Sequence, residues 1–351
     1  MSGLKKLQLI VLIIVGGIIG LLAPVVSQAA VNNDIGFNVA PKIPKNQIDK
    51  KKTFFDLAMK SGQTETLQTR IYNLTAQDIR VKSVVNTAWT GSSGAINYVN
   101  AAKKYDPSLR YKMGDLSKVQ GPEVVTVPAK GSKLVTVKVK IPQTDFNGNI
   151  LGGWYFERVD HKVTGNVKGA GNITNKYAYV VGMSYTMGQL PNPDLKLGKV
   201  AAGLSNYHHG VIANLRNPTA IIVPNLKMNT TISNRDGGKT VLHMKKDNVQ
   251  MAPNTVFSYP MLYGKTKLVA GHYRLHMVVK NTDRTWVFDR NFTVTKAQAN
   301  KYNADSVDNS GISIWLLIGL GALGMLILIL LILLIIYLIR RRRRDAAEAE
   351  D

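Results

Sequence analysis

The chain of 351 residues contains no cysteine. Disulfide scaffolds, zinc ribbons, thiol catalysis and dithiol redox motifs all need cysteine side chains, so these four classes are excluded. Any stable domain in this chain must rest on a conventional hydrophobic core.

Catalytic motifs are missing as well. The sequence has no H-E-x-x-H, G-x-S-x-G or phosphate-loop pattern, and only 22 of its residues are Asp or Glu. His272 and His276 are four residues apart, but in a strand they share a polar face with Arg274, and a cation there disfavours a metal. The adjacent pair at 208–209 is poorly placed to hold one ion. We predict no enzyme activity, no metal and no cofactor.

The C-terminal region holds one long apolar run. Residues 312–339 include no charged side chain, and about 20 such residues cross a hydrocarbon core about 30 Å thick. Trp315 and Tyr337 lie towards its two ends, where aromatic rings favour the headgroup region, and arginines occupy 340–344. We predict a transmembrane helix at 312–339 and a cytoplasmic tail at 340–351.

The N-terminal region is consistent with export. Lys5 and Lys6 precede an apolar stretch at 7–22, and Ser27 and Ala29 have the spacing that signal peptidase recognises. This pattern predicts a signal peptide at 1–29. An uncleaved second anchor is the alternative, although the run is short for a membrane span and ends at Pro24. Either way, the protein is expected at the cell membrane, single-pass, with its N-terminal ectodomain outside.

The charge is strongly basic. The chain has 45 Lys and Arg residues and a net charge of +23 at pH 7. Outside a membrane, such a field favours anionic wall polymers or acidic surface partners over nucleic acid. A basic surface that serves only solubility is the alternative, because the lysines are spread along the predicted strands.

The ectodomain alternates apolar and polar residues with a period of two, which is typical of antiparallel strands. In residues 134–141, one face has Leu134, Thr136, Lys138 and Lys140, and the other has Val135, Val137, Val139 and Ile141. The length exceeds what one core usually serves. We predict an all-β ectodomain of two immunoglobulin-like β-sandwich domains. The strand at 177–187 is expected to form a hairpin with the preceding one, and Pro191 and Pro193 mark the best linker.

Several blocks, in order, resemble one known family. They include "FNGNILGGWYFE", "NKYAYVVGMSYTM", "GVIANLRNP", "NVQMAPNTVFSYPM" and "LVAGHYRLHMVVK". They are similar to the WxL-interacting proteins of Gram-positive bacteria. The resemblance implies a peptidoglycan-binding domain at 31–164, whose structural boundary could extend to 190, and a host-binding domain at 165–300. A polar stalk at 301–311 then joins the second domain to the membrane helix.

The implied function is a membrane-anchored adaptor for cell-surface adhesion. Its implied partners are peptidoglycan or an anionic wall polymer, WxL-domain surface proteins and host matrix proteins. Two other functions remain open on the residues alone. A chaperone-like module could bind partner strands by β-addition, because immunoglobulin-like domains expose sheet edges. A wall hydrolase is the third class.

Aromatic residues are the candidate binding residues. Trp89, Tyr98 and Tyr111 lie in or beside loops rich in amide side chains, and such aromatic faces stack on sugars; core packing is the alternative for Trp89. Trp154 and Tyr155 follow Gly152 and Gly153 inside an otherwise apolar strand. Glycines in a strand mark a bulge or a close approach of neighbouring groups, for packing or for binding.

Overall fold

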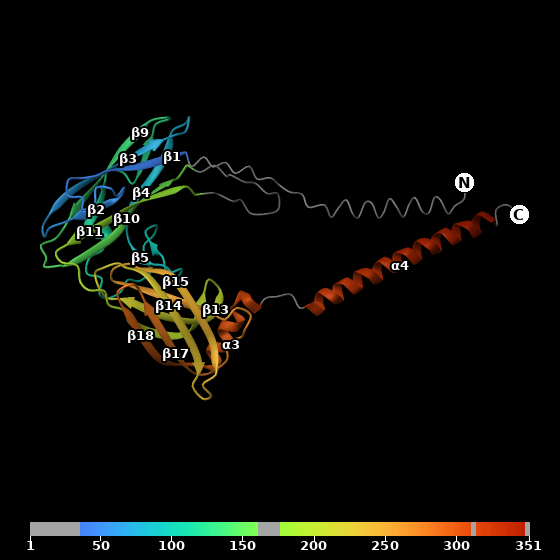
Figure 1. The fold of residues 1–351 in the computed structure, drawn as a ribbon. Helices are drawn as coiled ribbons and strands as arrows, with labels where there is room; N and C mark the ends of the chain where they lie inside the picture. Colours follow the sequence, from blue (N-terminus) through green and yellow to red (C-terminus); the bar gives the residue numbers. More distant parts are fainter. Residues whose placement is uncertain (1–35, 161–175, 310–313, 348–351) are drawn as a thin grey trace. The chain divides into compact units, whose positions relative to one another are not determined.

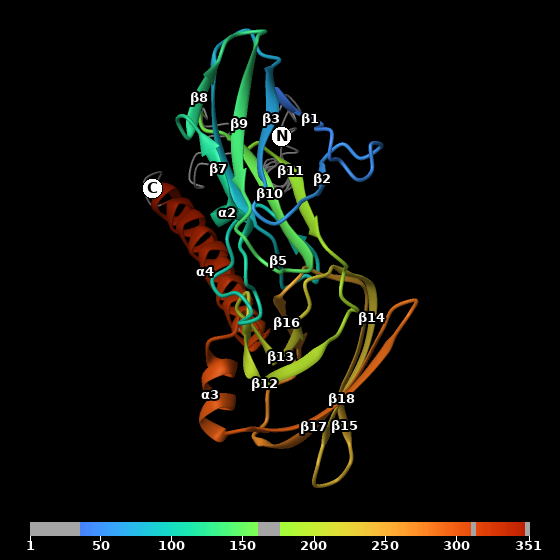
Figure 2. The same ribbon diagram turned by 90° about the vertical axis from the view of Figure 1, so that its left-hand side faces the viewer.

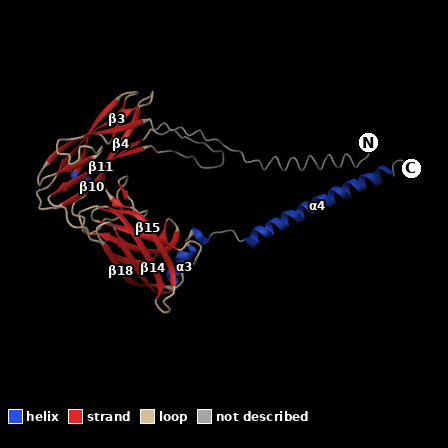
Figure 3. Cartoon of the chain, in the orientation of Figure 1, coloured by secondary structure: helices blue, strands red, loops and turns tan. Residues whose placement is uncertain are grey.

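The computed structural model describes residues 36–160, 176–309 and 314–347. The predicted signal peptide lies outside these residues. Most of the described chain is strand, and Figure 3 shows the strands gathered into sandwich-like sheets. The prediction of two immunoglobulin-like β-sandwiches and one C-terminal apolar helix is confirmed.

The first sandwich contains two sheets (Figure 1). One has the order β1 (Phe37–Lys42), β3 (Thr64–Asn73), β9 (Ser132–Lys140) and β7 (Ser117–Gln120). The other has the order β2 (Phe55–Ala58), β11 (Ala178–Met187), β10 (Gly148–Arg158), β4 (Ile79–Thr87) and β8 (Val124–Val127). All pairs are antiparallel except β2 with β11, which is parallel. A four-stranded sheet packed on a five-stranded sheet forms a β-sandwich of the immunoglobulin-like type.

The alternation in residues 134–141 places the core where it was predicted. Val135, Val137, Val139 and Ile141 of and after β9 are buried, whereas Leu134, Lys138 and Lys140 are exposed. The predicted hairpin is also confirmed, because β10 pairs with β11 without a break from Gly148–Met187 to Glu157–Ala178. Residues 178–187 therefore contribute to the core of the first sandwich.

The second sandwich has a three-stranded and a four-stranded sheet. The first has the order β12 (Lys196–Ser205), β13 (His208–Asn217) and β16 (Thr255–Leu262). The second has the order β15 (Thr240–Met251), β14 (Val223–Asn234), β17 (Gly271–Lys280) and β18 (Thr285–Val294). Its core is separate from that of the first sandwich and includes Phe257, Tyr259 and Leu275.

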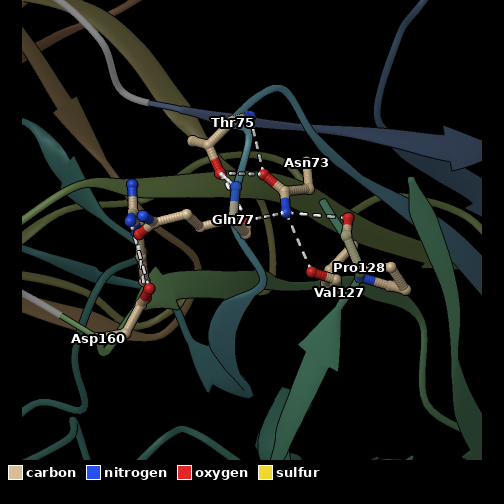
Figure 4. A network of polar contacts seen from close by, with 7 residues as sticks. Asn73, Thr75, Gln77, Val127, Pro128 and Asp160 are labelled. Carbon is tan, nitrogen blue, oxygen red and sulfur yellow. Dashed lines mark hydrogen bonds and ion pairs between the residues drawn. The ribbon is translucent and has the colours of Figure 1, made fainter. Parts of the chain in front are cut away.

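Each sandwich has its own buried asparagine, in the same sequence context, whose side-chain hydrogen bonds close one end of the sandwich. Asn73 is 2 % exposed, and its Nδ2 donates to the carbonyls of Gln77, Val127 and Pro128 at 2.8, 3.0 and 2.9 Å (Figure 4). Asn217 is 0 % exposed and donates in the same way to Ile221 and Ala252. In each case the threonine two residues later donates its N–H and hydroxyl to the asparagine Oδ1.

The shared sequence is Asn-x-Thr-Ala, at 73–76 and 217–220. Because its side chain is buried, Asn73 serves to tie the end of β3 to the end of β8. The Asn73-Leu74-Thr75 segment therefore has a structural role in the first sandwich.

The segment after the last strand belongs to the second sandwich. Helix α3 (Lys296–Ala304) begins with a capping box between Thr295 and Gln298 and lies beside β12 (Figure 2). Asn303 holds the backbone of Leu268 by two hydrogen bonds of 2.9 Å. The short helix η1 (Val307–Asn309) follows. Most of the predicted stalk is therefore folded against this domain.

Helix α4 (Ile314–Ala347) covers residues 314–339 of the predicted membrane span, and residues 312–313 lie outside the described residues. Its apolar part, Leu316–Arg340, has 25 residues. At a rise of about 1.5 Å per residue, this length exceeds a hydrocarbon core of about 30 Å. The helix is thus long and apolar enough to cross a membrane.

Candidate functional site

The candidate site begins at a small hairpin that extends from the first sandwich. Strand β5 (Trp89–Thr90) pairs with β6 (Ile96–Asn97), and a long irregular segment follows to residue 112. The half-buried indole of Trp89 donates from Nε1 to the carbonyl of Asn100 at 2.9 Å. Asn97 Oδ1 accepts from the N–H groups of Val99 and Asn100. These bonds fix the loop around the indole.

A buried ion pair joins this loop to the second sandwich. The side chain of Asp106 is 0 % exposed, and its two oxygens accept from Arg216 Nε and an Arg216 terminal nitrogen at 2.6 and 2.8 Å. Burial would raise the pKa of the Asp106 carboxyl, but the hydrogen bonds from Arg216 and Ser108 outweigh it, so the pKa lies below its ordinary value. Asp106 is therefore a charged, paired group at neutral pH.

Further polar contacts join the two sandwiches, which belong to one compact unit that begins at Phe37. The buried hydroxyls of Thr90 and Thr255 lie 2.8 Å apart, and the Ala252 N–H donates to Thr90 Oγ1 at 3.0 Å. The Gln250 N–H donates to the Gly94 carbonyl at 2.7 Å. The β5–β6 hairpin is therefore anchored on the second sandwich.

A pocket of about 670 Å³ lies between this loop and strands β12, β13 and β16. Its lining includes two aromatic rings, two amides, three lysines and the buried ion pair: Trp89, Tyr105, Asn100, Asn214, Lys103, Lys104, Lys199, Asp106 and Arg216. Lys112 Nζ lies 5.5 Å from the centre of the Tyr105 ring. The lysines give the pocket a net positive charge, because Asp106 and Arg216 neutralise each other.

This set of groups is suited to an anionic glycan. Aromatic faces pack against the apolar faces of sugar rings, amides bond to hydroxyl or acetamido groups, and ammonium groups attract carboxylates. The site holds no nucleophile beside a base, and within the described residues no three His, Asp or Glu side chains converge as metal ligands. The arrangement favours binding.

Two family models match the chain. The peptidoglycan-binding domain of WxL-interacting proteins matches residues 37–158, and their host-binding domain matches residues 168–304. The chain belongs to the WxL-interacting protein family. Its domains therefore support a cell-surface role in binding peptidoglycan and host, as the resemblance predicted. Both matched domains are binding domains, which is compatible with a protein that is not an enzyme.

Among solved structures, the chain is similar to the YadV chaperone, with 13% identity over 74% of this chain and 100% of that chain, at a TM-score of 0.30. The class 5 fimbriae chaperone CfaA is 12% identical over 72% and 98%, also at 0.30. The E. coli chaperone DraB is 14% identical over 74% and 97%, at 0.26. These likenesses are too distant to indicate function. No curated protein sequence matches the chain.

The structure separates the five aromatic candidates. Trp89 lines the pocket, together with Tyr105. Tyr98 packs on a small buried cluster of Ala88, Leu151 and Ala252, and burial raises the pKa of its hydroxyl. Tyr111 packs edge-on against Phe146, at 5.5 Å between ring centres, and donates to Thr144. Tyr98 and Tyr111 thus serve mainly to shape the loop.

Trp154 requires a correction. It is 0 % exposed, in the core of the first sandwich, with its ring 5.0 Å from that of Phe156, so no surface ligand can reach it. Tyr155 is half-buried on the opposite side of β10, beside Val84 and Val180, away from the pocket. The successive residues point to opposite faces of a strand, as strand geometry requires.

The two glycines before Trp154 permit close packing. A Cβ at Gly152 would collide with Met113 and with the Asn86 carbonyl, and one at Gly153 would lie 2.9 Å from the Tyr98 Cβ. The pairing of β10 with β4 and β11 continues through both residues, so there is no bulge. Packing is therefore sufficient to explain both glycines.

Sequence reasoning missed the cross-domain part of the site. Asp106 and Arg216 are 110 residues apart, and neither is conspicuous in its segment. A signal was present in the scarcity of acids, because an isolated Asp in a basic loop needs a cation if it becomes buried. Lys199 and Asn214 carry no comparable signal.

Proposed function

We propose that this protein is a membrane-anchored cell-surface adaptor that binds peptidoglycan through its first half, attaches to host matrix through its second half, and also binds WxL surface proteins. The observation that carries the proposal is the match of both family domains, in the expected order, on a chain that ends in one apolar helix. The basic charge supports contact with anionic wall polymers.

The domain boundary proposed here lies at 188–195. Strand β11 pairs with β10, and β12 begins at Lys196, so this segment is where the chain passes between cores. Pro191 and Pro193 lie within it. The proposed first domain thus extends beyond the end of the peptidoglycan-binding match, and the second continues through η1.

The proposed topology places both sandwiches outside the cell and the C-terminal arginines inside. Arginine and lysine residues beside a membrane span stay on the cytoplasmic side. Protease added to wall-stripped cells is therefore expected to degrade 31–309 and to leave a protected fragment that contains α4. Immunoblotting against a C-terminal tag measures this fragment. Neutral replacements at 340–344 should reduce the fraction of correctly oriented chains. If the protease left the large fragment of the unmodified protein intact, the topology would be the reverse of the one proposed.

The pocket around Trp89 is the proposed wall-glycan site. Trp89→Ala and Tyr105→Ala are each expected to weaken binding of the full chain to purified peptidoglycan about tenfold, because each removes a sugar-stacking face. Co-sedimentation with sacculi measures binding, and the exposed Tyr72 on β3 provides the control Tyr72→Ala.

The material distinguishes two sources of affinity. On sacculi stripped of anionic polymers, the salt-sensitive part of binding should fall while the effect of Trp89→Ala persists. If stripping abolishes all binding, charge alone explains the association and the pocket is not a peptidoglycan site.

A further inference from the structure

The second sandwich has a basic outer face on the sheet β15-β14-β17-β18. In β17 the side chains alternate, so that Tyr273, Leu275, Met277 and Val279 are buried and His272, Arg274, His276 and Lys280 are exposed. The exposed residues of the neighbouring strands on this face include Lys227, Asn229, His243 and Lys245. The predicted polar face around His272 and His276 is thereby confirmed and extended over four strands.

One row of polar side chains, made of two separate hydrogen-bonded pairs, crosses the face from β15 to β18. His243 on β15 bonds through Nδ1 to Thr231 Oγ1 on β14 at 3.0 Å. Thr231 is the register partner of His276 on β17, whose Nδ1 lies 3.1 Å from Asp289 Oδ1 on β18. Arg274 Nε also donates to Asp289 Oδ1, at 3.0 Å. These hydrogen bonds orient His243, His276 and Arg274 on the sheet.

Two hollows lie on either side of this row. One, of about 320 Å³, is lined by Lys227, Lys245 and Lys280, with Asp247 at the sheet edge. The other, of about 600 Å³, is lined by Arg235 and Arg274, with Asp289. Arg290 also borders it, but its register partner is the buried Leu275 and it donates to the Leu197 carbonyl of β12, so it does not belong to the outer face. Within the described residues, none of the three lysines has an ion-pair partner. Cationic groups therefore outnumber acidic ones in both hollows.

The amide and hydroxyl groups on the same face favour a sugar over a simple anion. Asn229 and Ser233 lie beside the cations on β14, and Asn291 lies beside them on β18. Sulfates or carboxylates of an extended chain would meet the lysines and arginines, and its hydroxyls would meet these neutral groups.

We propose that this outer face binds a sulfated glycosaminoglycan, a linear polyanionic sugar of host matrix. The proposal deepens the proposed host-binding role of the second half and rests on it. The ligand chemistry is set by complementarity with the two cationic hollows. Both hollows include residues of β14 and β17, so a linear chain that runs along these strands would meet both.

The test uses the full chain in nanodiscs and immobilised heparin as the probe. The triple variant Lys245→Ala, Arg274→Ala, Lys280→Ala is expected to raise the Kd at least tenfold, because it removes cations from both hollows. The matched control is Arg70→Ala, Lys133→Ala, Lys138→Ala, which removes the same residue types from exposed positions on strands of the first sandwich. The control should change the Kd less than twofold.

A second pair of variants separates the site from folding defects. Asp289→Asn removes the acid that binds Arg274 and His276, so it should strengthen heparin binding a few-fold without removing a buried group. The conservative triple variant Lys245→Arg, Arg274→Lys, Lys280→Arg keeps all three positive charges. Its Kd for heparin should stay within a few-fold of that of the unmodified protein.

Four results would overturn the inference. The control triple variant could weaken binding as much as the face variant, which would assign the effect to bulk charge. Wall teichoic acid could bind the face while heparin does not, which would assign the face to a bacterial polymer. Host matrix could bind the full chain with no competition from heparin, which would leave the host-binding function intact and refute this ligand; failure to bind any matrix would refute both.

Discussion

Replacing Trp154 with alanine is expected to lower the free energy of unfolding of the first sandwich by about 3–5 kcal/mol, the cost of emptying a large aromatic site in a core. Trp154 is 0 % exposed and packs on Phe156. Its Nε1 has no hydrogen-bond partner among the described residues, so Trp154→Phe should cost less. Urea unfolding followed by circular dichroism measures both.

Trp89→Ala is the matched comparison. The Trp89 ring is half-buried at a pocket, so its loss should change stability by about 1 kcal/mol or less while weakening glycan binding. The same residue type thus reports on stability at one position and on binding at the other. If Trp154→Ala left the stability unchanged and abolished glycan binding, Trp154 would be a binding residue and not a core residue.

Arg216→Ala is expected to cost about 3 kcal/mol, because it leaves the Asp106 carboxylate buried without its cation. The double variant Asp106→Ala, Arg216→Ala should cost less than the sum of the two single variants, since neither group is then stranded. Arg110→Ala is the control, because its pair with Asp145 is exposed and should contribute less than about 1 kcal/mol. Calorimetry of the full chain measures all four proteins.

The same pair gives a pH dependence with a definite sign. The pKa of Asp106 is lower in the folded protein than its ordinary value of 3.8. Its contribution to stability is therefore full above about pH 4 and is lost as the pH falls through the folded-state pKa. Asp106→Asn should remove this part of the acid sensitivity. Equal acid sensitivity in both proteins would show that the pKa of Asp106 is not lowered in the folded protein.

Local patterns predicted the strands well because burial in a sandwich repeats every two residues. The Val135, Val137 and Val139 series and the alternation around His272 and His276 needed no knowledge of the partner strands. The hairpin of β10 and β11 followed for the same reason, since neighbouring strands of suitable length usually pair. The predictions of export, of an apolar helix and of no thiol chemistry depend only on the composition along the chain.

The aromatic residues show where such patterns stop. Trp89 beside a loop and Trp154 inside an apolar strand were both candidate binding residues, yet one lines a pocket and the other is enclosed by two sheets. Which side of a strand faces a second sheet, and which faces a loop from elsewhere, depends on contacts between distant segments. Sequence alone could not distinguish the two tryptophans.

The sequence by itself determined the class of this protein: a cysteine-free, basic β protein with two sandwiches and an apolar C-terminal helix. Those properties come from composition and from periods of a few residues. Tertiary structure alone decided that Asp106 meets Arg216, that the Trp89 pocket forms between a loop and the second sandwich, and that His243 and His276 lie in one row. These sites join residues that are far apart in the chain, and only the register of the sheets and the contact between the cores brings them together.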